Sequence, residues 1–256
     1  MAHRIFGRHP VREALHSRAP VRRVWVLASR ADRGSLEEIR RLAARAGIPV
    51  HLVSRAELDR LAGGQSHQGV VAEVAPYRYS TLDAMLAAAA EQGEQPFILV
   101  LDHLTDVHNF GALVRTAEAA GLHGVIIPAR RSVAVTPTVY KTSAGAVVHM
   151  RIAQVPNIAQ ALRRLAAHGV WNVGLDPQAP HRYDQVDLRG PLSIVVGAEG
   201  KGLSRLVRRS CDLLVHLPMR GRVQSLNASV AGAVLIYEAL RQRLGGGTAG
   251  KPPAGP

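Results

Sequence analysis

The residues best suited to chemistry lie in three loops, each of which directly follows an apolar stretch of the chain. These loops span residues 102–109, 197–202 and 217–227. In open parallel sheets the carboxyl ends of the strands share one edge, so the three loops can converge on one pocket. The middle loop reads Gly-Ala-Glu-Gly-Lys-Gly, and its glycines allow the backbone to approach a ligand closely. The pattern therefore predicts a ligand site at the edge of a sheet.

Several common catalytic motifs are missing from the sequence. A phosphate-binding P-loop needs glycine at position 195 and Ser or Thr after Lys201, but Val195 and Gly202 stand there. The loop glycines run in the reverse order of the dinucleotide pattern G-x-G-x-x-G. The histidines at 103, 108 and 123 lack the spacing of paired metal ligands, and neither HExxH nor the G-x-S-x-G serine elbow occurs. These absences argue against a metal site and a serine nucleophile.

The last long segment of the chain, residues 217–244, leads from a loop into a helix. The first half of this helix is almost entirely small or apolar, which predicts burial on both sides. Ser225 and Asn227 stand where the helix begins, and free N–H groups at a helix N-terminus favour polar or anionic ligands. A functional site here and a core helix with Asn227 as an ordinary N-cap are both compatible with this segment alone.

The charge of the chain is strongly positive. Of 256 residues, 32 are Lys or Arg and 19 are Asp or Glu, a net charge of +13, and only three of the basic residues are lysines. Arginine grips phosphate with a planar fork and stacks on bases, so the excess indicates a nucleic-acid partner. An arginine-rich genome would produce the same excess. Residues 1–75 carry 13 basic and 7 acidic residues, a net charge of +6.

The single cysteine, Cys211, rules out an internal disulfide and a cysteine zinc cluster. The longest apolar runs fall short of the roughly 18 residues that a membrane span needs. Charged residues interrupt the first 15 positions, so they do not form a signal peptide. We therefore expect a cytoplasmic protein.

Alternating strand and helix patterns divide the chain into two α/β domains. Residues 1–75 form the first domain, which we expect to contain a mostly parallel sheet, with strands at 22–28, 49–53 and 69–74 and helices at 6–15, 35–47 and 54–61. Residues 76–95 are predicted to be a linker and lead-in helix, and the second domain covers residues 96–244. Its parallel strands are expected at 96–102, 123–128, 170–175, 191–197 and 213–218, and its helices at 110–121, 157–169 and 227–244. The Gly/Pro-rich tail, residues 245–256, is expected to be disordered.

Three segments in these loops resemble the motifs of one enzyme family. LDHLTDVHNFGALVRTAEAAG, IVVGAEGKGLS and LPMRGRVQSLNASVAGAVLIYE look like the three motifs of the SpoU-type (TrmH-like) RNA ribose 2′-O-methyltransferases, in the same order, and KTSAGA also fits. Residues 1–75 resemble the substrate-binding domain of many of these enzymes, which is similar to ribosomal protein L30e. The branch that methylates a guanosine of bacterial 23S rRNA is the most similar. One departure is Val107, where the family usually has proline, and it affects the rigidity of the first loop.

The resemblance implies a parallel-sheet α/β-knot fold with a deep C-terminal trefoil knot, a homodimer, and S-adenosyl-L-methionine as methyl donor. It also implies that backbone around Gly197, Leu217 and Leu226 holds the donor. The catalytic and substrate-orienting set that it implies is Asn109, Arg115, Glu199, Ser225 and Asn227. The expected partner is RNA, either 23S rRNA or a large-subunit precursor. A tRNA-directed enzyme and a non-catalytic RNA- or ribosome-binding protein on the same scaffold remain alternatives.

Transfer of a methyl group to a ribose needs the 2′-oxygen to be made nucleophilic and aligned with the donor carbon. Alignment alone can supply about 7–11 kcal/mol of the barrier. Arg115 is sometimes assigned as the base in this family, but an arginine guanidinium stays protonated in proteins. We therefore expect Arg115 to stabilise the developing alkoxide and grip the adjacent phosphate, while Glu199 orients Arg115 or the nucleotide.

Overall fold

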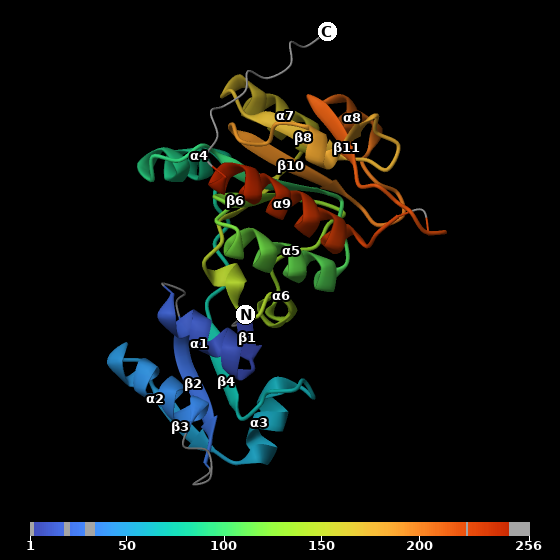
Figure 1. Ribbon diagram of the computed structural model, residues 1–256. Coiled ribbons are helices and arrows are strands. Elements are labelled where there is room, and N and C mark those ends of the chain that lie inside the picture. The colour runs from blue at the N-terminus through green and yellow to red at the C-terminus, as the bar shows by residue number, and fades with distance from the viewer. Residues whose placement is uncertain (1–2, 18–20, 29–33, 224, 246–256) are drawn as a thin grey trace. The chain divides into compact units, whose positions relative to one another are not determined.

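The structure is a computed structural model that describes residues 3–17, 21–28, 34–223 and 225–245 (Figure 1). Its contacts divide the chain into two compact units. The first unit comprises Met1–Arg78, Phe110–Arg115 and Ala134–His149. The second unit comprises Tyr79–Asn109, Thr116–Val133 and Met150–Pro256. Two later segments of the chain thus pack with the N-terminal part, and residues 246–256, most of the expected disordered tail, lie outside the described residues.

The first unit contains a four-stranded sheet with the strand order β1-β4-β2-β3. Its strands are β1 (His3–Phe6), β2 (Val21–Leu27), β3 (Val50–Val53) and β4 (Val70–Val74), and its N-terminal helices are α1 (Arg8–His16), α2 (Ser35–Arg45) and α3 (Arg55–Ala62). The three strands and three helices expected from the sequence are all present, within a few residues. The short strand β1 was not expected, because four residues carry little periodic signal.

The expectation of a mostly parallel sheet in the first unit is wrong. Only β2 and β3 pair in parallel, whereas β4 runs antiparallel to both β1 and β2. Helix α3 ends at Gly63, which has left-handed backbone angles and starts a turn that sends the chain back into the sheet in the opposite direction. The direction of β4 depends on this turn. The alternation of helices and strands in the sequence does not show in which direction a strand enters the sheet.

The second unit is built on a seven-stranded sheet in which all pairings of the described strands are parallel. The order is β7-β6-β5-β10-β8-β11-β9. The strands are β5 (Phe97–Asp102), β6 (Gly124–Pro128), β7 (Ile152–Val155), β8 (Trp171–Leu175), β9 (His181–Arg182), β10 (Leu192–Gly197) and β11 (Leu213–His216). The parallel βαβ expectation for this part of the chain is confirmed, and β7 and β9 are additional short edge strands.

Helices cover both faces of this sheet. On one face α4 (Leu82–Glu91), α7 (Ile158–Ala167) and α8 (Arg205–Arg209) bury Met85, Leu162 and Val207 against Val100 and Val195. On the other face α9 (Ala228–Leu244) packs along β10. Because α4 contributes to this core, much of the segment expected to be a linker belongs to the second unit. Two further short helices, α6 (Pro137–Thr142) and the 3-10 turn η1 (Ala146–Val148), lie in the first unit, and the 3-10 turn η2 (Tyr183–Gln185) lies in the second.

Arg243, in the last turn of α9, anchors that helix to the edge of the sheet. Its guanidinium lies 4.3 Å from the centre of the Phe97 ring and donates hydrogen bonds to the carbonyl oxygens of Gln95, Pro96 and Gly190. Burial lowers the pKa of Arg243 to about 10, so it keeps its charge at neutral pH. The C-terminal end of α9 is therefore fixed at the start of β5.

In the single chain, α9 is buried on one face only. Ala228, Gly232, Leu235, Ile236 and Ala239 are buried. On the remaining surface of the helix, Val230 and Tyr237 stand seven residues apart and are 49% and 50% exposed, and Leu244 is 77% exposed. The uniform apolar composition of the helix thus conceals one buried face and one exposed apolar face. Among the described residues, no helix is long and apolar enough to cross a membrane.

Candidate functional site

Three polar side chains from three separate elements meet at the carboxyl edge of the parallel sheet. The side-chain amide of Asn109 donates to Glu199 Oε2 at 3.1 Å. The amide of Asn227 donates to Asn109 Oδ1 at 2.9 Å and to Glu199 Oε1 at 3.2 Å. The sequence placed these residues in three loops, with 118 positions between Asn109 and Asn227. The hydrogen bonds confirm that the three loops converge.

The helices on either side set the orientation of this cluster. Asn109 lies in the first turn of α5 (Val107–Ala119), because Asp106 caps that helix by accepting the Asn109 N–H at 2.7 Å. Helix α5 therefore begins three residues before the predicted start at 110. Asn227 caps α9, and its Oδ1 accepts the N–H groups of Ser229 and Val230. Since this oxygen is committed to the cap, the amide NH₂ of Asn227 must point toward Asn109 and Glu199.

The loop that carries Glu199 closes tightly on itself. Ala198 and Gly202 exchange two backbone hydrogen bonds, at 2.8 and 3.1 Å, and Gly200 and Gly202 have positive φ angles of 74° and 64°. A Cβ on Gly197 would overlap the backbone of Gly202. The glycine pattern of this loop is thus required for its closure, which holds Glu199 at the end of β10.

The other residues implied by the family resemblance lie outside this hydrogen-bonded cluster. Arg115 lies on α5, six residues beyond Asn109, and its side chain is exposed. Ser225 is exposed ahead of α9, and among the described residues neither the Arg115 nor the Ser225 side chain forms a hydrogen bond or an ion pair. Leu217 follows β11 and is half-buried, whereas Leu226 is 41% exposed.

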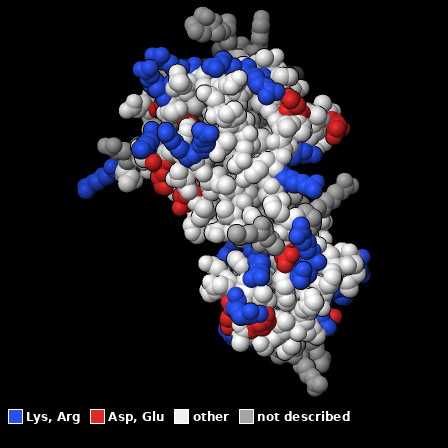
Figure 2. Space-filling view, turned by 180° about the vertical axis from the view of Figure 1, so that it is seen from behind, with Lys and Arg blue, Asp and Glu red and all other residues white. Residues whose placement is uncertain are grey.

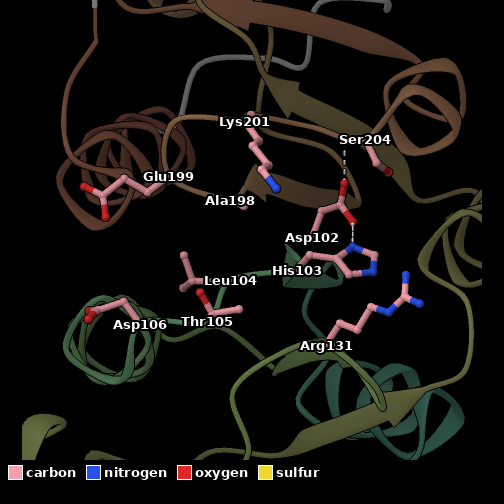
Figure 3. A pocket seen from close by; sticks show the side chains of 11 residues that line it. Asp102, His103, Leu104, Thr105, Asp106, Arg131, Ala198, Glu199, Lys201 and Ser204 are labelled. Carbon is pink, nitrogen blue, oxygen red and sulfur yellow. Dashed lines mark hydrogen bonds and ion pairs between the residues drawn. The ribbon is translucent and has the colours of Figure 1, made fainter.

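A pocket of about 550 Å³ lies beside the cluster, at the ends of the neighbouring strands β6, β5 and β10 (Figure 3). It includes Glu199 from the cluster. Its lining residues are Asp102, His103, Leu104, Thr105, Asp106, Arg131, Ala198, Glu199, Lys201, Gly202 and Ser204. The order of strands reverses here, since the chain moves from β5 to β6 on one side and later returns with β10 on the other. Such positions are where open parallel sheets bind ligands.

Sequence reasoning did not single out Asp102, His103 or Arg131. Asp102 is 1% exposed, accepts the backbone N–H of Ser204 at 2.6 Å, and pairs with His103 Nδ1 at 2.6 Å. Asp102 could have been noticed in the sequence, because it is a carboxylate at the end of an otherwise apolar strand. A buried carboxylate is costly unless it has a partner. Arg131 gave no comparable signal, because it lies in a basic pair after β6.

Two observations limit the chemistry of the second unit. Burial raises the pKa of the Cys211 thiol to about 12, with a smaller contribution from Asp212, so this cysteine stays protonated and is not a nucleophile at neutral pH. Within the described ranges no group of three or more His, Cys, Asp or Glu residues is suited to hold a metal ion. The described part of the site therefore relies on amide, carboxylate and cationic groups.

Basic side chains are spread over the surface rather than gathered beside one element. Figure 2 shows Lys and Arg in several groups on one face of the chain, with fewer acidic side chains among them. The described ion pairs join neighbouring residues in most cases, such as Arg60 with Glu57 and Arg182 with Asp184. Exposed ion pairs of this kind contribute little to stability and break at little cost. Together with the basic residues in excess of the acidic ones, these arginines can therefore attract an anionic partner.

Comparisons with known proteins show the family of the chain. A family model described as SpoU rRNA Methylase family matches residues 96–237, and one described as RNA 2′-O ribose methyltransferase substrate binding matches residues 4–80. YacO of Bacillus subtilis, named for the TrmH family of tRNA/rRNA methyltransferases, is 45% identical over 93% of this chain and 95% of its own length. An uncharacterized tRNA/rRNA methyltransferase of Mycolicibacterium vanbaalenii is 43% identical over 93% of this chain and 76% of its own.

Solved structures show the same fold over nearly the whole chain. The SpoU methyltransferase AviRb from Streptomyces viridochromogenes, in complex with the cofactor AdoMet, has a TM-score of 0.79 and 25% identity, covering 95% of this chain and 91% of its own. A structure described as RNA 2′-O ribose methyltransferase has a TM-score of 0.75 and 28% identity, covering 94% of this chain and 88% of its own. The parallel-sheet α/β fold is therefore that of SpoU methyltransferases, and this chain belongs to the SpoU family of RNA methyltransferases.

Proposed function

We propose that this protein methylates a ribose 2′-hydroxyl in RNA and that its target is a guanosine of 23S rRNA. The observation that carries the proposal is the cluster of Asn109, Glu199 and Asn227. Three elements deliver these side chains to one point at the carboxyl edge of the sheet, beside a pocket whose lining includes Arg131 and Lys201. This arrangement can hold a ribose in a fixed orientation, which is the main requirement for transfer of a methyl group.

The methyl donor is S-adenosyl-L-methionine, which supplies an electrophilic methyl group on a sulfonium. The residues present fit this donor. The backbone at Gly197 and Leu217 comes at the ends of two parallel strands, and Leu226 exposes an apolar surface just ahead of α9. Apolar side chains with a few strand-end backbone groups are typical of sites for nucleoside-like ligands. We assign donor binding to these three positions.

We assign the remaining roles to side chains of this chain. Arg115 carries the positive charge that stabilises the ribose oxygen as its proton leaves, and it grips the adjacent phosphate. Glu199, with both oxygens accepting hydrogen bonds from Asn109 and Asn227, orients Arg115 or the nucleotide. Ser225, ahead of the N-terminus of α9, contributes to orienting the substrate. Because Asn227 is fixed by its cap on α9, the cluster is preorganised before RNA arrives.

The experiment that tests this function is transfer of a labelled methyl group from the donor to unmodified 23S rRNA and tRNA. We expect incorporation into 23S rRNA, at one ribose of a guanosine that is unmodified in a strain lacking the gene. Incorporation into tRNA alone would identify a tRNA-directed enzyme. Absence of transfer to either RNA, with RNA binding retained, would identify a binding protein on this scaffold and contradict the proposed activity.

We infer that the first unit binds RNA through the sheet face on which Trp25 lies. The Trp25 ring packs partly against the apolar cluster around α3. Arg4 and Arg23 lie 5.9 and 5.8 Å from its centre, and the His51 ring stacks on it at 6.1 Å. Cationic groups beside a partly exposed aromatic ring are typical of surfaces that bind unpaired bases.

Binding of 23S rRNA is expected to quench the fluorescence of Trp25 in a Trp171→Phe background, which leaves Trp25 as the single tryptophan. Arg23→Gln should weaken RNA binding several-fold, because it removes a phosphate-pairing charge beside the ring. Arg41→Gln, which removes an exposed charge on α2, is the matched control. Unchanged fluorescence at saturating RNA, with equal affinity for both variants, would contradict this assignment.

We also infer a homodimer formed through the exposed face of α9. The support is the stripe of Val230, Tyr237 and Leu244, because exposed apolar side chains gathered along one helix mark an interface. We expect sedimentation equilibrium at micromolar concentration to give the mass of two chains. A Val230→Glu/Tyr237→Glu double variant should give the mass of one. Leu206→Glu on α8 changes a leucine outside the stripe that is 61% exposed, and this control variant should remain dimeric. A monomeric wild type would reject the dimer.

Two further properties complete the proposal. We infer a deep trefoil knot in the C-terminal part of the second unit, supported by the insertion of β10 between the earlier strands β5 and β8. We also propose the cytoplasm as the compartment of the protein, since an RNA substrate and an unpaired cysteine both suit it.

A further inference from the structure

Two residues of the pocket beside the cluster have an unusual backbone conformation. Among the described residues, four that are not glycine have a positive φ angle: Gln68, His103, Arg131 and Ala144. His103, with φ 58°, and Arg131, with φ 55°, both line this one pocket. Left-handed backbone angles are costly for residues with a side chain and gather at sites where function requires them. Here they occur at two residues with basic side chains, in the loops that follow the adjacent strands β5 and β6.

The surrounding structure holds both residues in place. The buried carboxylate of Asp102 bonds to His103 Nδ1 on one oxygen and accepts the Ser204 N–H on the other, each at 2.6 Å. The loop of Arg131 is tied to the loop of His103, since the Ser132 hydroxyl and the Val133 N–H both donate to the carbonyl oxygen of Leu104, at 3.0 and 2.9 Å. The imidazole and the guanidinium are therefore presented by two loops that are linked to each other.

Two of the basic side chains that line this pocket, Arg131 and Lys201, have no acidic partner among the described residues. Within the described ranges neither Arg131 nor Lys201 forms a hydrogen bond or an ion pair, and both are exposed. The acidic residues nearby are already engaged: Asp102 with His103, Asp106 with the cap of α5, and Glu199 with the two asparagines. Figure 3 shows Arg131 and His103 close together on one side of the pocket and the Lys201 side chain extending toward it from another. Such a group of cations is suited to an anion.

We propose that Arg131, together with His103 and Lys201, binds a backbone phosphate of the RNA beside the target nucleotide. The inference rests on the proposed function, because it takes the anion to be part of the RNA substrate. Arg131 is the main contact, since its planar fork matches two phosphate oxygens. His103, whose Nδ1 pairs with Asp102, faces the anion with Nε2, and Lys201 adds a point charge. Glu199 lines the same pocket, so a phosphate bound here fixes the position of the strand relative to the catalytic cluster.

The test compares Arg131→Gln with Arg131→Lys and with Arg130→Gln. Arg130 is the adjacent exposed arginine and does not line the pocket, so its variant removes the same charge from the same loop. We expect Arg131→Gln to raise the KM for a 23S rRNA transcript about tenfold, the loss typical of one charged hydrogen bond. Arg131→Lys should retain part of the affinity, because it keeps the charge but lacks the fork. Donor affinity, measured by calorimetry, should not change in any variant.

Binding of the same transcript without donor, measured against salt concentration, provides a second readout. Loss of one phosphate contact should reduce the slope of log affinity against log salt by about 1 in Arg131→Gln. The slope and the KM of Arg130→Gln should remain close to those of the wild type. If Arg131→Gln impairs folding, its melting temperature will be lower than that of the wild type. The KM and salt slope of Arg131→Lys then test the proposal in its place.

Equal KM values and salt slopes for Arg131→Gln and Arg130→Gln would overturn the proposal. So would weakened donor binding with unchanged RNA binding, since the anion would then be the carboxylate of the donor. Donor-free binding separates this inference from the proposed activity. If the wild type transfers no methyl group but Arg131→Gln still loses affinity and salt slope, the activity is rejected and the phosphate site stands.

Discussion

Replacing Arg115 with alanine is expected to lower the rate of methyl transfer by about 10²–10³-fold while donor affinity stays the same. Removal of one group that stabilises a developing oxyanion has a cost of this size, about 2.7–4 kcal/mol. Arg115 is exposed on α5 and forms no hydrogen bond or ion pair among the described residues, so its loss should leave the fold intact. The measurement is the single-turnover rate at saturating RNA, with donor affinity determined separately by calorimetry.

Arg115→Lys separates electrostatic stabilisation from base catalysis. If Arg115 stabilises the oxyanion, lysine should restore part of the rate, because it keeps the charge but lacks the planar fork. If Arg115 were a base, lysine would lose its proton more readily and shift activity to lower pH. Arg163→Ala, which removes an exposed arginine on α7, is the matched control. A wild-type rate in Arg115→Ala would reject both roles and leave Glu199 and Asn227 as the residues to examine.

The sequence was sufficient to predict the second unit because its local patterns and its tertiary packing agree. Strands β5 and β10 are fully buried and, apart from Ser193 in β10, consist of apolar residues bounded by Pro, Gly or Asp, which is typical of a central parallel strand. Asn109, Glu199 and Asn227 could be selected because each follows or caps such an element. Their hydrogen bonds required the structure, since they depend on the order of β5 and β10 in the sheet rather than on either sequence segment.

The features that sequence reasoning missed have their cause in tertiary contacts. The first unit contains antiparallel pairings because the chain turns back after Gly63. The apolar sequence of α9 did not show which of its residues are exposed, since Val230 and Leu235 have similar polarity but opposite exposure. Arg131 could not be recognised either, because its backbone angle and its link to the loop of His103 leave no pattern in the sequence. Composition thus identified the kind of partner but not the residues that contact it.

Glu199→Gln should lower the rate of methyl transfer by about 10²-fold although it preserves the shape of the side chain. The cap on α9 fixes Asn227 Oδ1, so the Asn227 amide must donate. It donates to Asn109 Oδ1, which in turn fixes the Asn109 amide as a donor. Both amides donate to Glu199, one to each oxygen. Glutamine offers a single oxygen, so one pair of donors must face each other and the network cannot recover by rotating an amide.

Because each side chain of this network depends on the others, the effects of Glu199→Gln and Asn109→Asp on the rate should not add. A facing pair of donors costs on the order of 1–3 kcal/mol once bound RNA excludes water. Loss of the negative charge that orients Arg115 or the nucleotide adds to this cost. Asn109→Asp in the Glu199→Gln background supplies the missing acceptor and should recover part of the rate, whereas Asn109→Asp alone should be slow because it places two carboxylates together. Glu91→Gln on α4, at an exposed position, is the matched control. Single-turnover rates for the wild type, the two single variants of the cluster and the double variant form the cycle. Strictly additive losses would show that these side chains act independently and that the network does not position the catalytic groups.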